Sequence, residues 1–297
     1  MKVIKNMAFS VRERLKSKTN PETIHFDEIL NLYAMERLLY RISQSEYSDR
    51  FILKGALLFT IWRNNNFRLT KDIDLLGRLD NSEENIRKVF HNILHTKVGD
   101  DGIVFFSETI STTLIKHDSE YHGVRVTFQG KLDTARIDIQ VDVGFNDLIY
   151  PEPQKIEYPV ILDFPNPVIL SYSKETAIAE KFEAMTTLGI LNSRMKDFYD
   201  IWLLSHNFSF EMRVLSESLQ KTFKHRNVNL DSNITAFTED FAESKAVQWK
   251  AFRNKIRRTE LPDSFTVVIS NVKNFIVPAI NPSDLTLKWD PEKLKWL

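Results

Sequence analysis

Two kinds of hydrophobic pattern alternate along the first third of the chain. Apolar residues recur at helical spacing in three segments that we predict to be helices: residues 4–16, 26–45 and 82–96. Two short apolar runs predict strands: residues 51–53 and 72–76. The Lys54-Gly55-Ala56 turn opens a helical run that reaches about residue 63, and three asparagines at 64–66 predict a loop.

The pattern changes in the middle of the chain. Residues 103–145 are rich in β-branched and aromatic residues with partial alternation, and we predict three mainly antiparallel strands there. A proline-rich stretch at 151–167 predicts an extended connector, and from 173 to about 273 the spacing is helical. We therefore expect an α+β domain in residues 1–168, with N-terminal helices, and an all-α domain in residues 169–297.

Composition excludes several classes of protein. The 297 residues contain 42% hydrophobic and 27% charged residues, which is ordinary for a globular protein. With 40 basic and 40 acidic residues, only local patches favour nucleic acid or membrane binding. The absence of cysteine excludes disulfides and Cys-ligated metal sites. The N-terminus lacks the apolar core of a secretory signal, and no apolar run reaches the roughly 18–20 residues that span a bilayer. We expect a cytoplasmic protein without membrane contact.

Acidic residues recur at period-two spacing within two predicted strands. Asp72 and Asp74 point to one face of the first strand, and Asp138 and Asp142 lie on the polar face of a later one. Carboxylates gathered on one face repel one another, and a divalent ion ligated by oxygen relieves that repulsion. Taken alone, the first pattern also fits a solvated strand end, and the second fits a sheet with one wet face.

The turn at Lys54-Gly55-Ala56 is a candidate phosphate-binding element. It connects a predicted strand to a predicted helix, where backbone N–H groups and the helix dipole attract anions. Glycine permits close approach of a phosphate to the backbone. The same glycine equally fits an ordinary turn.

Residues 175–204 predict a pair of helices that carry one lysine and two aspartates. The first helix is expected to stop at Gly189, and Asn192-Ser193 can cap the second. Lys181 lies within the first helix, while Asp197 and Asp200, three residues apart, share a face of the second. Ordinary surface ion pairs are the alternative explanation.

These motifs occur together and in one order, and in this combination the sequence resembles the AbiEii/AbiGii-type nucleotidyltransferase toxin family. The likeness runs from about residue 51 to residue 204, with a looser likeness around QWKAF. The segments that carry it are LKGALL, RLTKDIDLL, IQVDVGFND, AEKFEAM and NSRMKDFYDIW. The resemblance implies a polymerase-β-like nucleotidyltransferase core with a mixed sheet, followed by a helical C-terminal part.

The resemblance also implies catalytic roles for the acidic residues and the lysine. Asp72, Asp74 and Asp142 would hold Mg²⁺ or Mn²⁺, and Asp142 could take the proton of the attacking hydroxyl. Lys181, supported by Asp197 and Asp200, would reach the triphosphate of a nucleoside triphosphate. Asp138 matches no family site and is expected to be solvated.

Phosphate binding is assigned to the glycine turn and to the residues before the Asp72–Asp74 pair. The turn comprises Lys54, Gly55 and Ala56. Many members of the superfamily have serine after the glycine, so backbone N–H groups must replace that hydroxyl contact here. Arg68 and Thr70 are further candidates for phosphate binding, although Arg68 equally fits a surface arginine.

The implied reaction moves a nucleoside monophosphate from a nucleoside triphosphate to an acceptor and releases pyrophosphate. Several members of the family modify the 3′ end of tRNA, which makes tRNA the expected acceptor. Residues 244–258 support this expectation, because they are basic and contain no acid; the candidate RNA-binding side chains are Arg253, Lys255, Arg257 and Arg258. A solvated helix face explains the same pattern.

Other functions fit the same residues. The acceptor could be a protein or a small molecule, or the chain could be a non-catalytic, nucleotide-binding subunit of a toxin–antitoxin complex. The resemblance further implies a type IV toxin–antitoxin system and a cognate antitoxin.

Overall fold

The chain forms two compact units. The computed structural model describes residues 6–20, 24–62, 70–116, 122–231, 234–256 and 261–297. One unit comprises Met1–Asp147 and Gln154–Ser171, and the other comprises Leu148–Pro153 and Tyr172–Leu297. The expected division into domains at 168/169 stays a prediction.

The first unit is built on a seven-stranded mixed sheet with the strand order β3-β4-β5-β2-β1-β7-β6. The strands are β1 (Phe51–Lys54), β2 (Asp72–Gly77), β3 (Ile103–Lys116), β4 (His122–Leu132), β5 (Ala135–Phe145), β6 (Gln154–Glu157) and β7 (Val168–Ser171). Strands β2 and β5 run parallel, as do β1 and β7, and the other neighbours are antiparallel. The α+β class and mixed sheet expected from the sequence are confirmed.

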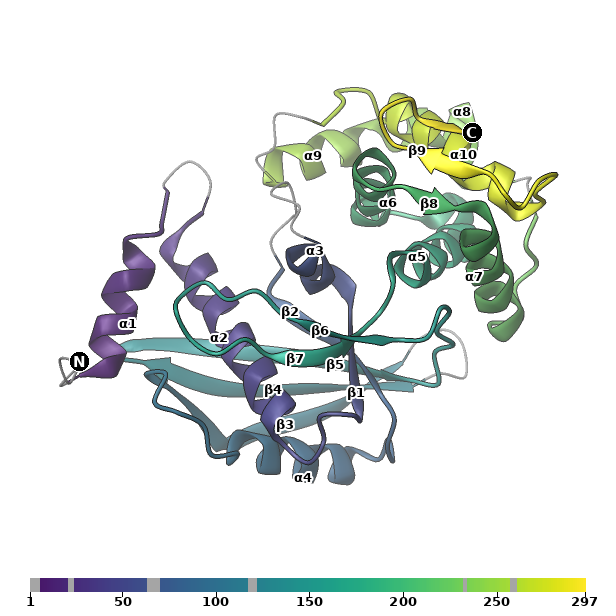
Figure 1. The fold of residues 1–297 in the computed structure, drawn as a ribbon. Coiled ribbons are helices and arrows are strands. Elements are labelled where there is room, and N and C mark those ends of the chain that lie inside the picture. Colours follow the sequence, from purple (N-terminus) through teal and green to yellow (C-terminus); the bar gives the residue numbers. More distant parts are fainter. Residues whose placement is uncertain (1–5, 21–23, 63–69, 117–121, 232–233, 257–260) are drawn as a thin grey trace. The chain divides into compact units, whose positions relative to one another are not determined.

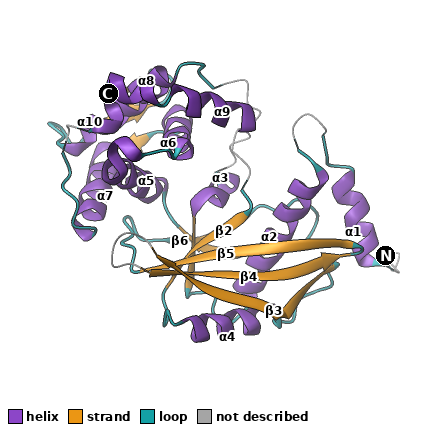
Figure 2. Cartoon of the chain, turned by 180° about the vertical axis from the view of Figure 1, so that it is seen from behind, coloured by secondary structure: helices purple, strands orange, loops and turns teal. Residues whose placement is uncertain are grey.

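Helices cover one face of this sheet and leave part of the other face open (Figures 1 and 2). They are α1 (Met7–Lys16), α2 (Phe26–Gln44) and α4 (Glu83–Leu94); a 3₁₀ turn η1 (Gly55–Leu57) and the short α3 (Leu58–Ile61) follow β1. Along β5, Ile137, Ile139 and Val141 are buried while Asp138 is exposed, so alternate residues face the core and the solvent. The polar face predicted from the sequence is therefore present.

Strands β6 and β7 replace part of the connector predicted from the prolines. The prolines at 151, 153, 159, 165 and 167 flank these strands and interrupt neither. Strand β7 pairs with β1, more than a hundred residues earlier, and β6 pairs along the outer side of β7. Because the partner of β7 is remote in sequence, local composition alone suggested only an extended connector.

The second unit is predominantly helical, as expected, with one addition. Its helices are α5 (Lys174–Leu188), α6 (Met195–Asn207), α7 (Met212–His225), α8 (Glu239–Ser244), α9 (Ala246–Ile256) and α10 (Phe265–Ile280), with 3₁₀ turns at Gly189–Leu191 (η2) and Thr235–Phe237 (η3). A small sheet of β8 (Phe210–Glu211), β9 (Lys288–Asp290) and β10 (Lys295–Trp296) corrects the expectation of an all-α part. Trp289 anchors it: the indole is buried and donates to the carbonyl of Ser205 at 2.6 Å.

The turn between α5 and α6 follows the sequence prediction in part. Helix α5 ends before Gly189, whose φ of +48° favours glycine, so the predicted stop is confirmed. The N-cap of α6 is Arg194 instead of Asn192 or Ser193. The buried Asn192 accepts the backbone N–H of Arg194 at 2.7 Å, so its side chain orders the turn before the helix. Within the described ranges, none of the helices is long and apolar enough to cross a membrane.

Candidate active site

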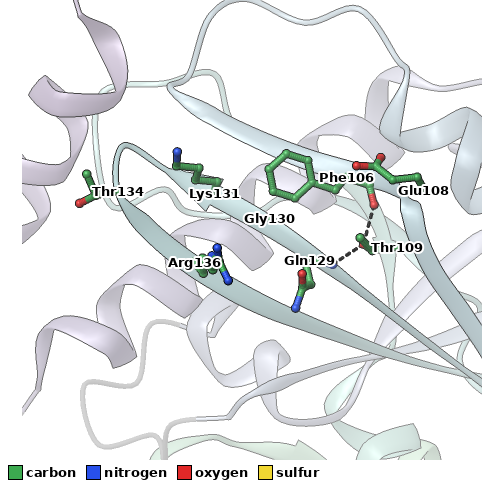
Figure 3. Close-up of a pocket in the computed structure, with 8 residues that line it drawn as sticks. All are labelled: Phe106, Glu108, Thr109, Gln129, Gly130, Lys131, Thr134 and Arg136. Carbon is green, nitrogen blue, oxygen red and sulfur yellow. Dashed lines mark hydrogen bonds between the residues drawn. The ribbon is translucent and has the colours of Figure 1, made fainter.

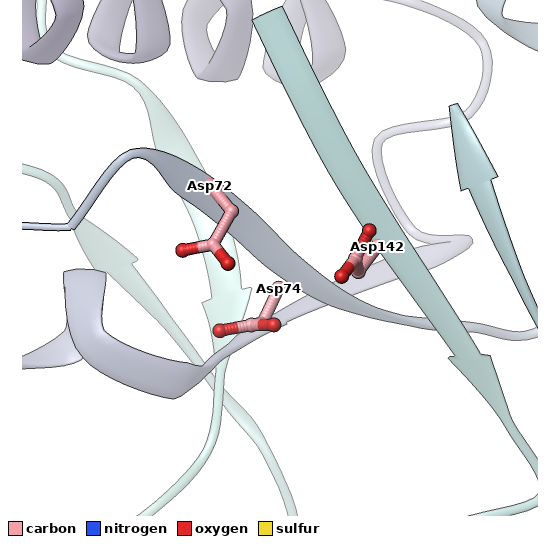
Figure 4. Close-up of side chains that lie close together, drawn as sticks. All are labelled: Asp72, Asp74 and Asp142. Atoms are coloured by element: carbon pink, nitrogen blue, oxygen red, sulfur yellow. The ribbon is translucent and has the colours of Figure 1, made fainter. Parts of the chain in front are cut away.

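Three carboxylates converge on the open face of the sheet in the first unit (Figure 4). Asp72 and Asp74 project from β2, and Asp142 projects from the neighbouring β5, where it lies directly opposite Asp74. One oxygen from each carboxylate lies within 4.8 Å of the others, and all three residues are half-buried. The structure therefore brings together the three residues that the sequence singled out as metal ligands.

The donor set fits a divalent ion. Carboxylate oxygens are the ligands that Mg²⁺ and Mn²⁺ prefer, and three negative charges this close repel unless a positive charge lies among them. Across the described part of the chain, no other set of three acidic or histidine side chains converges in this way. When bound, a divalent ion supplies Lewis-acid polarisation of a phosphoryl oxygen.

Cations flank the carboxylates on the neighbouring strands to either side. In register across the strands, Arg125 of β4 lies opposite Asp142, and Lys54 of β1 lies opposite Asp74. This row of four charged residues, Arg125–Asp142–Asp74–Lys54, crosses four adjacent strands. The sequence alone did not single out Arg125; its signal is a polar residue between Val124 and Val126 in a predicted strand.

Arg125 holds both oxygens of Asp142. Its Nε donates to Oδ1 at 2.8 Å and its terminal NH2 group donates to Oδ2 at 2.7 Å, which is a bidentate pairing. The hydrogen bond to Asp142, together with the charges of Asp142, Asp72 and Asp74, raises the pKa of Arg125. The guanidinium is therefore the nearest counter-charge to the third carboxylate.

Gly55 is required by the position of Asp74. Its φ is +72°, and a Cβ built on it would lie 1.9 Å from Oδ2 of Asp74. Any other residue would collide with that carboxylate and would also adopt an unfavourable backbone conformation. Glycine thus has a structural reason at this turn that is independent of phosphate, and the adjacent Ala56 is buried.

The residues predicted to bind phosphate make defined contacts near the triad where the structure describes them. The ammonium of Lys54 lies 2.5 Å from Oδ2 of Asp147 and close to Gly144 on β5. The hydroxyl of Thr70 donates to Oδ1 of Asp72, so Thr70 orients one carboxylate of the triad. Arg68 lies outside the described residues. The phosphate-binding roles of Lys54, Ala56 and Thr70 stay predictions.

Asp138 lies on the same strand and face as Asp142 but outside the triad. It is exposed, and its Oδ1 accepts the amide of Gln129 at 3.2 Å. The polar face continues past it to a hollow of about 520 Å³ lined in part by Phe106, Lys131 and Arg136 (Figure 3). None of the three converging carboxylates lines that hollow.

A second charged cluster forms inside the helical unit. The ammonium of Lys181 on α5 lies 3.1 Å from Asp197 and 2.8 Å from Asp200, both buried on α6. Arg194, which was not predicted as a site residue, places its Nε 2.8 Å from the other oxygen of Asp197. The predicted association of Lys181 with both aspartates is thus present, as buried ion pairs rather than surface ones.

The basic helix α9 presents fewer available cations than its sequence suggests. Arg253 is ion-paired with Asp263 and its side chain is only 21% exposed. Trp249 is buried and donates to the carbonyl of Pro262 at 3.1 Å, so the expected apolar face packs inward. Lys250 and Lys255 are exposed. Arg257 and Arg258 lie outside the described residues.

Comparisons with known proteins agree with this geometry. The family described as "Nucleotidyl transferase AbiEii toxin, Type IV TA system" matches residues 37–271. No curated protein sequence matches the chain.

Solved structures share the fold at low sequence identity. A proposed nucleotidyltransferase from Helicobacter pylori is 11% identical with a TM-score of 0.53, over 88% of this chain and 99% of that one. The MenT4 nucleotidyltransferase toxin from Mycobacterium tuberculosis H37Rv is 16% identical with a TM-score of 0.51, over 97% and 92%. JHP933 from Helicobacter pylori is 11% identical with a TM-score of 0.50, over 87% and 95%. Since the family match spans most of the sequence, the chain belongs to the AbiEii nucleotidyltransferase toxin family of type IV toxin–antitoxin systems.

Proposed function

We propose that this nucleotidyltransferase transfers a nucleoside monophosphate from a nucleoside triphosphate to an acceptor hydroxyl, with Mg²⁺ or Mn²⁺ held by Asp72, Asp74 and Asp142. The observation that carries the proposal is the convergence of these three carboxylates on one face of the sheet. An in-line displacement at phosphorus needs charge stabilisation at the attacking and leaving oxygens, and an oxygen-ligated divalent ion supplies it when bound.

The protein residues position the reactants and move the proton. Asp142 accepts the proton of the attacking hydroxyl, because it lies at the outer end of the triad, away from the turn at Gly55. Thr70 fixes the orientation of Asp72, and Gly55 leaves room for Asp74. Backbone N–H groups that follow Gly55 contact the triphosphate.

Lys181 neutralises charge on the triphosphate as pyrophosphate leaves. The ion pairs of Lys181 support this role, because two buried aspartates hold its ammonium in one orientation. A cation held in place stabilises a developing negative charge without reorganisation. Arg194, which shares Asp197 with Lys181 and is half exposed, is a second candidate for the same anion.

The acceptor in this proposal is the 3′ end of tRNA. The exposed Lys250 and Lys255 on α9, with Arg257 and Arg258 following in the sequence, support electrostatic contact with an RNA backbone. In the type IV system that the family implies, the chain is the toxin and a cognate antitoxin restrains it. The proposed setting of this reaction is the cytoplasm.

Label transfer tests the proposal directly. Purified protein is incubated with total tRNA, each labelled nucleoside triphosphate in turn and Mg²⁺, and the RNA is resolved on a gel. We expect one nucleotide to label tRNA, Asp74→Asn to abolish labelling, and Asp138→Asn, on the same open face, to retain it. Label that appears in protein or small molecules would refute the tRNA acceptor, and full activity in Asp74→Asn would refute the metal site.

A further inference from the structure

The third carboxylate of the triad is already engaged by a protein cation. Both oxygens of Asp142 accept hydrogen bonds from Arg125, at 2.8 and 2.7 Å. Asp72, by comparison, accepts a hydrogen bond from the uncharged hydroxyl of Thr70. The guanidinium of Arg125 and a divalent ion would therefore bind to the same carboxylate.

The two cations compete electrostatically for Asp142. A bidentate guanidinium lies in the carboxylate plane and takes one lone pair of each oxygen, which leaves each oxygen one further lone pair. A divalent ion held by Asp142 and Asp74 would use an oxygen of the same carboxylate, and two positive centres at one oxygen repel each other. Coordination of an ion by Asp142 would therefore weaken its pairing with Arg125.

Arg125 is placed so that it can leave. Its side chain is 42% exposed, whereas that of Asp142 is 19% exposed, so the arginine is the partner with access to solvent. It lies on β4, on the side of Asp142 remote from β2, so it can turn away without passing Asp72 or Asp74. Gln140 lies beside the pair, and with its amide oxygen turned toward Arg125 it accepts from Nε at 3.3 Å and NH2 at 3.2 Å.

We propose that Arg125 is a positioning residue that competes with the divalent ion for Asp142. While the ion is absent, Arg125 neutralises the third carboxylate and allows the triad to stay assembled. When an ion is bound, Asp142 would coordinate it in place of the guanidinium, and Arg125 would turn toward solvent over β4. The inference rests on the proposed function, because it assigns a residue to the metal site that function requires.

Direct measurement of Mn²⁺ affinity, without nucleotide or acceptor, tests this competition. Mn²⁺ is titrated into the full chain and free ion is followed by electron paramagnetic resonance. We expect Arg125→Ala to bind Mn²⁺ about two- to fivefold more tightly than the wild type, the size of effect that a partly exposed ion pair produces. Arg125→Lys, which reaches one oxygen only, should fall between the two.

Thermal unfolding supplies a second readout. Without metal, Arg125→Ala should melt at a lower temperature than the wild type because the three carboxylates lose their counter-charge. Saturating Mn²⁺ should therefore raise its melting temperature by more than it raises that of the wild type. Lys131→Ala is the matched control, since Lys131 lies on the same face of β4 but opposite Arg136, and it should behave as the wild type in both assays.

The outcomes separate this inference from the proposed function. If the wild type binds Mn²⁺ and Arg125→Ala binds it equally or more weakly, the competition is refuted while the metal site stands. If neither the wild type nor any Arg125 variant binds Mn²⁺, the metal site itself is refuted, and the competition with it.

Discussion

Asp142 lies directly opposite Asp74 in the parallel pairing of β5 with β2. That register places the two carboxylates side by side on the open face of the sheet, and a shift of one residue would turn Asp142 toward the helices. Strands β2 and β5 are separated by more than fifty residues, with β3 and β4 between them in sequence. The convergence of the three carboxylates thus depends on the packing of the whole unit as well as on the acidic motifs.

Replacement of Gly55 by alanine should damage both stability and the metal site. The new Cβ would lie 1.9 Å from Oδ2 of Asp74, and the backbone would keep a φ of +72°. We expect Gly55→Ala to lower the free energy of unfolding by roughly 1–3 kcal/mol and to weaken Mn²⁺ binding because Asp74 moves. Urea denaturation and a Mn²⁺ titration measure the two effects. Gly99→Ala is the control, since nothing lies within 4 Å of that Cβ; equal behaviour of the two variants would contradict this account of Gly55.

Removal of the Lys181 ammonium should destabilise the helical unit as well as abolish transfer. Lys181→Met leaves Asp197 and Asp200 buried, with Asp200 deprived of a cation 2.8 Å away. Breaking a buried ion pair from one side costs about 3–5 kcal/mol. Lys293→Met, whose exposed lysine pairs with Asp290, should change the free energy of unfolding by less than about 1 kcal/mol in the same chemical denaturation.

A second substitution separates the two roles of Lys181. Lys181→Arg keeps the positive charge between the aspartates, so we expect most of the stability to return while labelling of the acceptor stays low, because the ammonium geometry is lost. Wild-type transfer by Lys181→Arg would show that the position needs only a charge.

Charge reversal on α9 should weaken RNA binding. Lys250 and Lys255 are exposed there, whereas Arg253 is paired with Asp263. We expect Lys250→Glu with Lys255→Glu to lower the affinity for total tRNA and to flatten its dependence on salt concentration, as the loss of phosphate contacts does. Filter binding at several salt concentrations measures both. Lys273→Glu, on the exposed face of α10, should leave the slope unchanged. A slope unaltered in the double variant would place the RNA surface elsewhere.

Burial of Glu36 should make the stability of the first unit depend on pH. Desolvation raises its pKa to about 7, against the opposing effects of Arg37 and the backbone N–H of Ile161. The folded protein therefore holds this proton more tightly than the unfolded chain. The resulting stabilisation is present below about pH 4.5 and is lost as the pH rises through 7; it amounts to roughly 3 kcal/mol.

Glu36→Gln keeps the acceptor for Ile161 and removes the titration. We expect the free energy of unfolding of the wild type minus that of Glu36→Gln to fall between pH 5 and pH 8, measured by urea denaturation at each pH. A constant difference would mean that Glu36 is ionised in the folded protein throughout.

The sequence by itself determined what depends on neighbours a few residues away. Alternation along residues 135–143 placed Asp138 and Asp142 on a polar face, because side chains in a strand alternate. Period-two spacing put Asp72 with Asp74, and Gly189 marked the end of α5 because few other residues adopt a positive φ. Asp72, Asp74 and Asp142 were therefore recognisable as candidates without coordinates.

Only the tertiary structure decided which of these faces meet and in what register. It paired β2 with β5, which places Asp142 beside Asp74 as the family resemblance implied, and it brought Arg125 against Asp142. It also made strands of residues 154–157 and 168–171, which pair with each other and, through β7, with the distant β1. Local pattern fixes the face of a residue, whereas partner and register follow from packing between segments far apart in the chain, which no short window of sequence records.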